Sequence, residues 1–86
     1  PIVMFSAEWC GVCKKAAQWM KAQNIPFRER DVEKDPKALG ALKEAARRAG
    51  MTAQSIGGSV PVFAVGNEVF KGFDPNRIRA AVDRKK

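Results

Sequence analysis

The alternation of apolar and polar positions predicts strands and helices in turn. The run 2–5, Ile-Val-Met-Phe, is continuously apolar with β-branched and aromatic members, which is typical of a strand covered on both faces. The next apolar positions recur at helical spacing, as Val12, Ala16, Trp19 and Met20. Asn24-Ile25-Pro26 ends this pattern, and residues 27–32 follow the proline as a short second strand. The first helix is therefore expected to begin at the cysteines of residues 10–13.

A second helix and a loop are predicted to follow. Asp35-Pro36 is a helix-capping residue with a proline at the first helical position after it. Apolar residues then recur at helical spacing, as Leu39, Leu42, Ala46 and Ala49. Gly50 ends this helix. Residues 51–59 carry Thr, Gln, Ser and a Gly-Gly pair without any periodicity, so we expect them to form a loop.

The remainder of the chain predicts a hairpin and a last helix. Residues 61–65 and 68–71 flank Gly66-Asn67, a two-residue connection typical of hairpins. Asp74-Pro75 repeats the capping signal and begins the last helix. The expected buried stripe of that helix is Ile78, Ala81 and Val82. The order βαβαββα predicts an α/β protein with a four-stranded mixed sheet and helices on both faces, as one domain over residues 1–86.

The formal net charge of +7 does not by itself indicate a nucleic-acid or membrane partner. Lys and Arg are scattered among acidic residues, which favours a solvated surface with some attraction for acidic partners. No apolar run approaches the roughly 20 residues of a membrane span, and the first residues lack the pattern of a signal peptide. We therefore expect a soluble, cytoplasmic monomer. Whether an upstream segment was removed from this chain is left open.

The two cysteines carry the candidate chemistry. Cys10-Gly11-Val12-Cys13 lies where a strand is followed by a helix, and backbone N–H groups and the helix dipole favour a thiolate there. Cys10 is then the expected nucleophile and Cys13 the resolving thiol. With two cysteines and no histidine, ligands for a structural zinc are lacking and no metal is expected. The alternatives are an inert buried pair or half of a metal site.

The segment from Phe5 to Lys14, Phe-Ser-Ala-Glu-Trp-Cys-Gly-Val-Cys-Lys, resembles the active-site segment of the thioredoxin superfamily. The short chain and two later segments are more similar to the glutaredoxins. Ser59-Val60-Pro61-Val62-Phe63 resembles their Thr-Val-Pro segment, whose proline is cis and faces the cysteines. Lys71-Gly72-Phe73-Asp74-Pro75 resembles their Gly-Gly-x-Asp segment, which holds the γ-glutamyl end of glutathione. The resemblance implies a thioredoxin-like fold and a glutathione-dependent thiol-disulfide oxidoreductase.

The resemblance also implies which residues contact the substrate, with glutathione as co-substrate. The expected contacts are Trp9, Val12, Lys14, Val60, Pro61, Gly72, Phe73 and Asp74. Trp9 and Phe73 are expected to flank the cysteines as exposed aromatic residues, whereas the helical spacing of Trp19 predicts a core position. Asp74 is expected either to cap the last helix or to cap it and hold an ammonium group as well.

Two residues depart from the glutaredoxin pattern. Ala7 occupies the place of a lysine that in many glutaredoxins holds the glycyl carboxylate of glutathione, and Lys71 replaces a glycine. Lys14 and Gln23 are the candidates to replace the lost lysine. The partners implied are disulfide-containing proteins and glutathione, with glutathione reductase or thioredoxin reductase as the source of electrons.

Two other functions are compatible with the same residues. Gly72-Phe73-x-Pro75 with Ile78 also resembles the glutaredoxin-like hydrogen donors of ribonucleotide reductase, which thioredoxin reductase reduces, although Asp74 stands where those proteins have Arg. A glutathione-ligated [2Fe-2S] carrier, with Cys10 as the protein ligand, is the other alternative.

Overall fold

The computed structural model of the chain describes residues 2–52 and 60–84. Its elements, in chain order, are β1 (Ile2–Ser6), α1 (Gly11–Ala22), β2 (Phe27–Asp31), α2 (Ala38–Arg48), β3 (Val62–Val65), β4 (Glu68–Lys71) and α4 (Pro75–Arg84). The predicted order βαβαββα is confirmed, and the hairpin turn at Gly66 uses a positive φ of 60°, which glycine adopts without strain.

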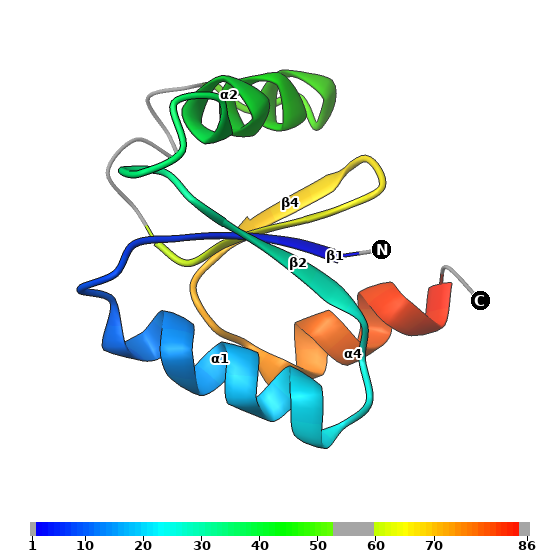
Figure 1. Ribbon diagram of the computed structural model, residues 1–86. Helices are drawn as coiled ribbons and strands as arrows, with labels where there is room; N and C mark the ends of the chain where they lie inside the picture. Colours follow the sequence, from blue (N-terminus) through cyan, green and yellow to red (C-terminus); the bar gives the residue numbers. More distant parts are fainter. Residues whose placement is uncertain (1, 53–59, 85–86) are drawn as a thin grey trace.

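The four strands form one mixed sheet in the order β2-β1-β3-β4. β1 runs parallel to β2, with Ser6 opposite Asp31, and antiparallel to β3, with Met4 opposite Phe63. β3 and β4 form the predicted antiparallel hairpin. The parallel pair places the carboxyl ends of β1 and β2 at one end of the sheet, and α1 begins at that same end (Figure 1).

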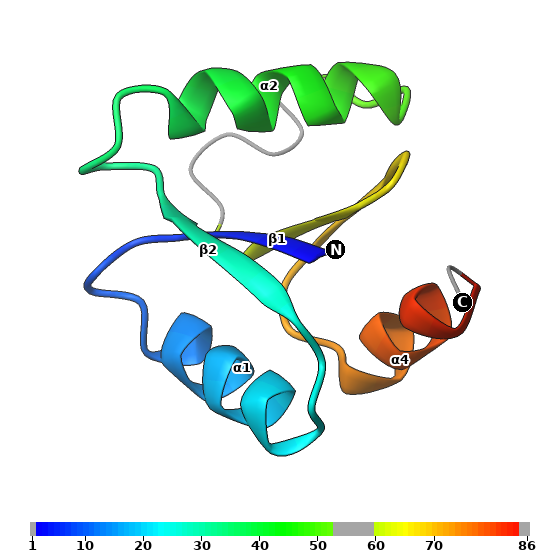
Figure 2. The ribbon, with the colours of Figure 1, turned by 45° about the vertical axis from the view of Figure 1, so that its right-hand side comes forward.

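Helices cover both faces of the sheet, as predicted. Figures 1 and 2 show α1 and α4 below the sheet and α2 above it. Because strand side chains alternate, Met4 points to the side of α1 and Phe5 to the side of α2, and both are fully buried. We call the buried residues on the first side the α1 core cluster; among its members are Met4, Ala7, Cys10, Cys13, Met20, Phe63, Phe70 and Ile78. The cysteines are thus part of a hydrophobic core.

The start of α2 differs from the prediction. The helix begins at Ala38 rather than Pro36, and its N-cap residue Lys37 makes no side-chain cap. Asp35 instead accepts a hydrogen bond from the backbone N–H of Lys37 at 2.9 Å, closing a turn ahead of the helix. That hydrogen bond, followed by the nearby Arg30 guanidinium, holds the pKa of Asp35 below its usual value.

The buried face of α2 agrees with the prediction in part. Leu39, expected in the buried stripe, is 45% exposed. Leu42 and Ala46 are buried as predicted, together with Ala38 and Ala45, whereas Ala49 is half-buried. The other strand and helix boundaries differ from the prediction by one residue at most, and most of the predicted loop, residues 53–59, lies outside the described residues.

Candidate active site

Cys10 and Cys13 form a disulfide at the N-terminus of α1, with their Cα atoms 5.3 Å apart. Cys10 is the N-cap residue of the helix, and its Sγ accepts a hydrogen bond from the backbone N–H of Cys13 at 3.1 Å. The exposed fraction of Cys10 is 5%, against 1% for Cys13. Both cysteines are therefore buried, and the slightly more exposed one holds the N-cap position.

The electrostatic surroundings of Cys10 favour a thiolate after reduction. An N–H donor aimed at the sulfur and the positive end of the helix dipole both stabilise negative charge there. The first turn of α1 contains no acidic residue that would oppose this effect. The arrangement is suited to nucleophilic attack by Cys10, and buried Cys13 is placed to attack the Cys10 sulfur in turn.

Two later segments pack against the α1 core cluster, to which the cysteines belong. The Val60–Pro61 peptide bond is cis, as predicted. The carbonyl oxygen of Pro61 accepts a hydrogen bond from the N–H of Gly72 at 2.9 Å, which joins the two segments expected to bind glutathione. Gly72 has a φ of 78°, a conformation that strains any residue with a Cβ. Both Val60 and Phe73 pack against the α1 core cluster that contains the cysteines.

The aromatic residues near the site divide into an exposed and a half-buried group. Trp9 is 67% exposed, as expected. Phe73 is half-buried rather than exposed, because its ring packs edge-on against Trp19 with the ring centroids 5.8 Å apart. Trp19 packs against the core but is itself half-buried, so its assignment to the core was only partly right.

A contact that the sequence analysis missed joins the cysteine loop to the loop after β2. The indole N–H of Trp9 donates a hydrogen bond to the Glu33 carboxylate at 2.9 Å, and the Lys34 ammonium forms an ion pair with Glu8 at 2.5 Å. The Glu8 carboxylate thereby raises the pKa of Lys34. Asp31 fixes this loop by accepting hydrogen bonds from the backbone N–H groups of Glu33 and Lys34.

Comparison with known proteins identifies the family. The family model described as Glutaredoxin matches residues 2–70, which include the cysteine pair and the cis-proline. This chain belongs to the glutaredoxin family. The glutaredoxin fold is also seen in solved structures: the thioredoxin-like protein BC3987 has a TM-score of 0.72 with 22% identity over 94% of this chain and 99% of that one. The glutaredoxin(grx-1) from Archaeoglobus fulgidus has a TM-score of 0.68 with 17% identity over 94% of this chain and 84% of that one.

Curated relatives of this glutaredoxin carry a different name. The Global transcriptional regulator Spx 1 of Oceanobacillus iheyensis is 31% identical over 75 residues, which are 87% of this chain and 53% of that protein. The Global transcriptional regulator Spx of Listeria innocua is 30% identical over 46 residues, which are 54% of this chain and 35% of that protein. The chain thus spans about half, or less, of the length of these relatives.

The absence of a lysine at position 7 has structural consequences. Ala7, in the place of the usual lysine, is buried at 4% exposure beside the cysteines. Gln23 accepts a hydrogen bond from Arg79 at the far end of α1, so it does not replace that lysine. Lys14 is exposed in the first turn of α1 and lines the same surface depression as Ala7. Of the two candidate replacements, Lys14 alone lies beside the site.

Asp74 has a structural role that accounts for its presence. Its carboxylate accepts hydrogen bonds from the backbone N–H groups of Asn76 at 3.1 Å and Arg77 at 3.3 Å, which caps α4.

Because asparagine keeps the accepting oxygen, we expect Asp74→Ala to lower the free energy of unfolding by about 1 kcal/mol and Asp74→Asn by much less. Urea denaturation measures both values. An equal loss in the two variants would contradict the capping role.

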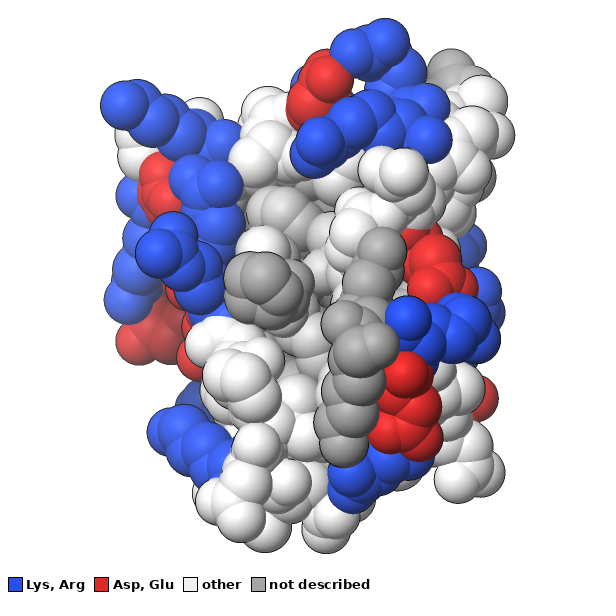
Figure 3. Space-filling view, turned by 90° about the vertical axis from the view of Figure 1, so that its right-hand side faces the viewer, with Lys and Arg blue, Asp and Glu red and all other residues white. Residues whose placement is uncertain are grey.

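Within residues 2–52 and 60–84, no group of three or more His, Cys, Asp and Glu side chains is arranged to hold a metal ion. Among the helices of the described residues, none is both long and apolar enough to cross a membrane. Lys and Arg are spread over several elements with acidic residues between them on the face shown in Figure 3, which is the end of the molecule opposite the start of α1.

Proposed function

We propose that this glutaredoxin is a dithiol oxidoreductase that reduces protein disulfides or glutathione mixed disulfides through Cys10 and Cys13. The observation that carries the proposal is the position of Cys10, which is the N-cap of α1, the acceptor of the Cys13 N–H and the more exposed of the two cysteines. This position favours the thiolate, and the thiolate is the form of cysteine that attacks disulfides.

The reaction needs only the two thiols. The Cys10 thiolate attacks one sulfur of the substrate disulfide, the S–S bond breaks, and the first substrate thiolate leaves and takes up a proton. Cys13 then loses its proton and attacks the Cys10 sulfur, so the second substrate thiol leaves and the Cys10–Cys13 disulfide forms. The protein is oxidised by two electrons, and the substrate disulfide is reduced to two thiols.

Glutathione is the proposed reductant of the oxidised protein. Two molecules of glutathione would return two electrons to the disulfide and leave as glutathione disulfide, which glutathione reductase recycles. The hydrogen bond between Pro61 and Gly72 supports a groove in which Val60, Pro61, Gly72 and Phe73 contact this co-substrate. Asp74 and Lys14 are the proposed charged contacts at its rim. In this proposal the protein acts on protein disulfides as a cytoplasmic monomer and is reduced again by glutathione.

A coupled assay of NADPH oxidation tests the proposal. The protein is supplied with a disulfide substrate and either glutathione with glutathione reductase or thioredoxin reductase alone. Turnover with glutathione is the expected result. Turnover with thioredoxin reductase only would keep the dithiol chemistry but replace the reductant, and no turnover with either would refute the proposed activity.

The Spx relatives favour a second candidate function. They are named global transcriptional regulators, and this chain aligns with them over 54% to 87% of its own length. In that case the Cys10–Cys13 pair would be a redox-dependent element of a regulatory protein rather than a turnover site. Negligible turnover with both reductases, together with reversible oxidation of the pair by disulfides, would favour this candidate.

A further inference from the structure

A surface depression lies beside the cysteine pair, on the side of β2. Its volume is about 480 Å³, and its lining consists of Ser6, Ala7, Glu8, Lys14, Glu29, Asp31 and Lys34. Two of these residues form backbone hydrogen bonds with Cys10. The Cys10 N–H donates to the Ala7 carbonyl at 3.0 Å, and the Lys14 N–H donates to the Cys10 carbonyl at 3.4 Å. The depression therefore adjoins the Cys10 backbone, although neither cysteine is part of its lining.

The charge of this depression is opposite to that of the whole chain. Three carboxylates and two ammonium groups line it, which gives a net charge of −1, whereas the chain carries +7. Lys34 is paired with Glu8, so the charges that remain are those of Glu29, Asp31 and Lys14. No Lys or Arg of the described residues forms an ion pair with Glu29 or Asp31.

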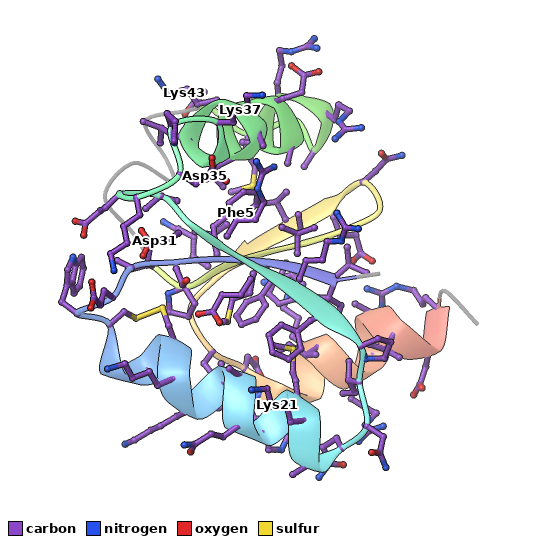
Figure 4. All side chains as sticks on the ribbon, in the orientation of Figure 1. Phe5, Lys21, Asp31, Asp35, Lys37 and Lys43 are labelled. Carbon is purple, nitrogen blue, oxygen red and sulfur yellow. A yellow bond between two sulfur atoms is a disulfide. The ribbon has the colours of Figure 1, made fainter. Side chains whose placement is uncertain are left out.

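The two carboxylates are held in place by the fold. Alternation along β2 puts Glu29 and Asp31 on the face of α1, and Figure 4 shows Asp31 at the same end of the sheet as the disulfide. Buried Ser6 donates a hydrogen bond to one oxygen of Glu29 at 3.0 Å. One oxygen of Asp31 accepts the two backbone hydrogen bonds of the loop after β2. Each carboxylate keeps a second oxygen for a ligand.

We propose that Glu29 and Asp31 are specificity-determining residues, which make this glutaredoxin prefer disulfides with a cationic group near the sulfur over disulfides with a carboxylate there. The proposal rests on the disulfide-reducing function proposed above and names its substrate class. A lysine in place of Ala7 would attract a carboxylate to this position. Here the position is apolar and the adjoining depression has a net negative charge, so a carboxylate keeps only Lys14 as a cationic partner and meets the two like charges of Glu29 and Asp31.

Salt separates this local preference from the attraction exerted by the whole molecule. At low ionic strength the net charge of +7 steers anionic substrates toward the protein. At 0.15 M salt the Debye length is about 8 Å, which screens distant charges far more than groups in contact. The preference for cationic disulfides should therefore increase as salt is raised to this value.

The test uses three small disulfides that differ in charge: cystamine with two ammonium groups, bis(2-hydroxyethyl) disulfide with none, and 3,3′-dithiodipropionate with two carboxylates. The reduced protein is mixed with each at 0.15 M salt, and the rate of protein oxidation is measured by alkylation of the remaining thiols. Each rate is divided by the rate at which dithiothreitol reduces the same disulfide. This division corrects for differences in intrinsic reactivity among the three disulfides. We expect cystamine to exceed dithiodipropionate by about fivefold, the upper range for exposed ion pairs.

Charge-neutral variants identify the residues responsible. The double variant Glu29→Gln with Asp31→Asn keeps the accepting oxygens and should reduce the cystamine to dithiodipropionate ratio to near one. Glu44→Gln removes one carboxylate charge from α2, where Glu44 is exposed and pairs with Arg47, and should leave the ratio unchanged. Circular dichroism checks that each variant is folded.

The possible outcomes separate this inference from the function on which it rests. Reduction of all three disulfides with a ratio near one, or with dithiodipropionate preferred, overturns the charge preference and leaves the oxidoreductase function standing. The same conclusion follows if the double variant keeps the ratio of the unmodified protein. Failure to reduce any of the three disulfides refutes the proposed function together with the inference.

Discussion

Cys10→Ser is expected to abolish disulfide reduction, and Cys13→Ser is expected to stop the reaction at a mixed disulfide. Cys10 is the more exposed of the two cysteines and its Sγ accepts the Cys13 N–H, so its loss removes the proposed nucleophile, and the rate should fall by about 10³-fold or more. Cys13 is buried at 1% exposure and acts only after Cys10 is bound to the substrate. Without Cys13, the bond between Cys10 and the substrate has no internal thiol to break it.

Mass spectrometry after treatment with glutathione disulfide distinguishes the two roles. Cys13→Ser should gain the mass of one glutathione, whereas Cys10→Ser should remain unmodified on the same timescale. Serine replaces sulfur with oxygen at nearly constant shape, so circular dichroism should show the same fold for both variants. Faster modification of Cys10→Ser than of Cys13→Ser would reverse the assignment.

The dipeptide Asp-Pro predicted the start of one helix correctly and the start of another helix wrongly. Asp74-Pro75 predicted the start of α4 because the Asp74 carboxylate receives the free N–H groups of the first helical turn. Asp35-Pro36 predicted the start of α2 two residues early, because Asp35 accepts the N–H of Lys37 in a separate turn. Sequence alone shows that an aspartate is able to cap but does not show which N–H groups come within its reach.

The candidate site was predictable where its parts are close in the sequence. Cys10 and Cys13 needed only the local pattern of a strand followed by a helix. The contacts of Trp9 with Glu33 and of Glu8 with Lys34 join residues far apart in the chain, and no single segment signals them. The predicted parallel pairing of β1 with β2 brings the loops that follow both strands to one end of the sheet, but it does not determine which side chains of those loops meet.

The core beneath the cysteines should be the most sensitive part of the fold to truncation. Phe63 is fully buried, lies opposite Met4 in the sheet and stacks on Phe70 with the ring centroids 5.5 Å apart. We expect Phe63→Ala to lower the free energy of unfolding by about 3–5 kcal/mol, the usual cost of such a cavity. Total stabilities are about 5–15 kcal/mol, so this loss would approach unfolding if the chain is near the lower limit.

A matched truncation on α2 provides the control for Phe63→Ala. Leu39 is 45% exposed, so Leu39→Ala should change the free energy of unfolding by about 0.5 kcal/mol or less. Urea denaturation with an unchanged slope measures both values. Because Cys10 and Cys13 belong to the same cluster as Phe63, the activity of Phe63→Ala should also be lost at the lower urea concentration at which its core unfolds. If Phe63→Ala and Leu39→Ala lowered the free energy of unfolding by comparable amounts, α2 rather than the cluster beneath the cysteines would hold the site in place.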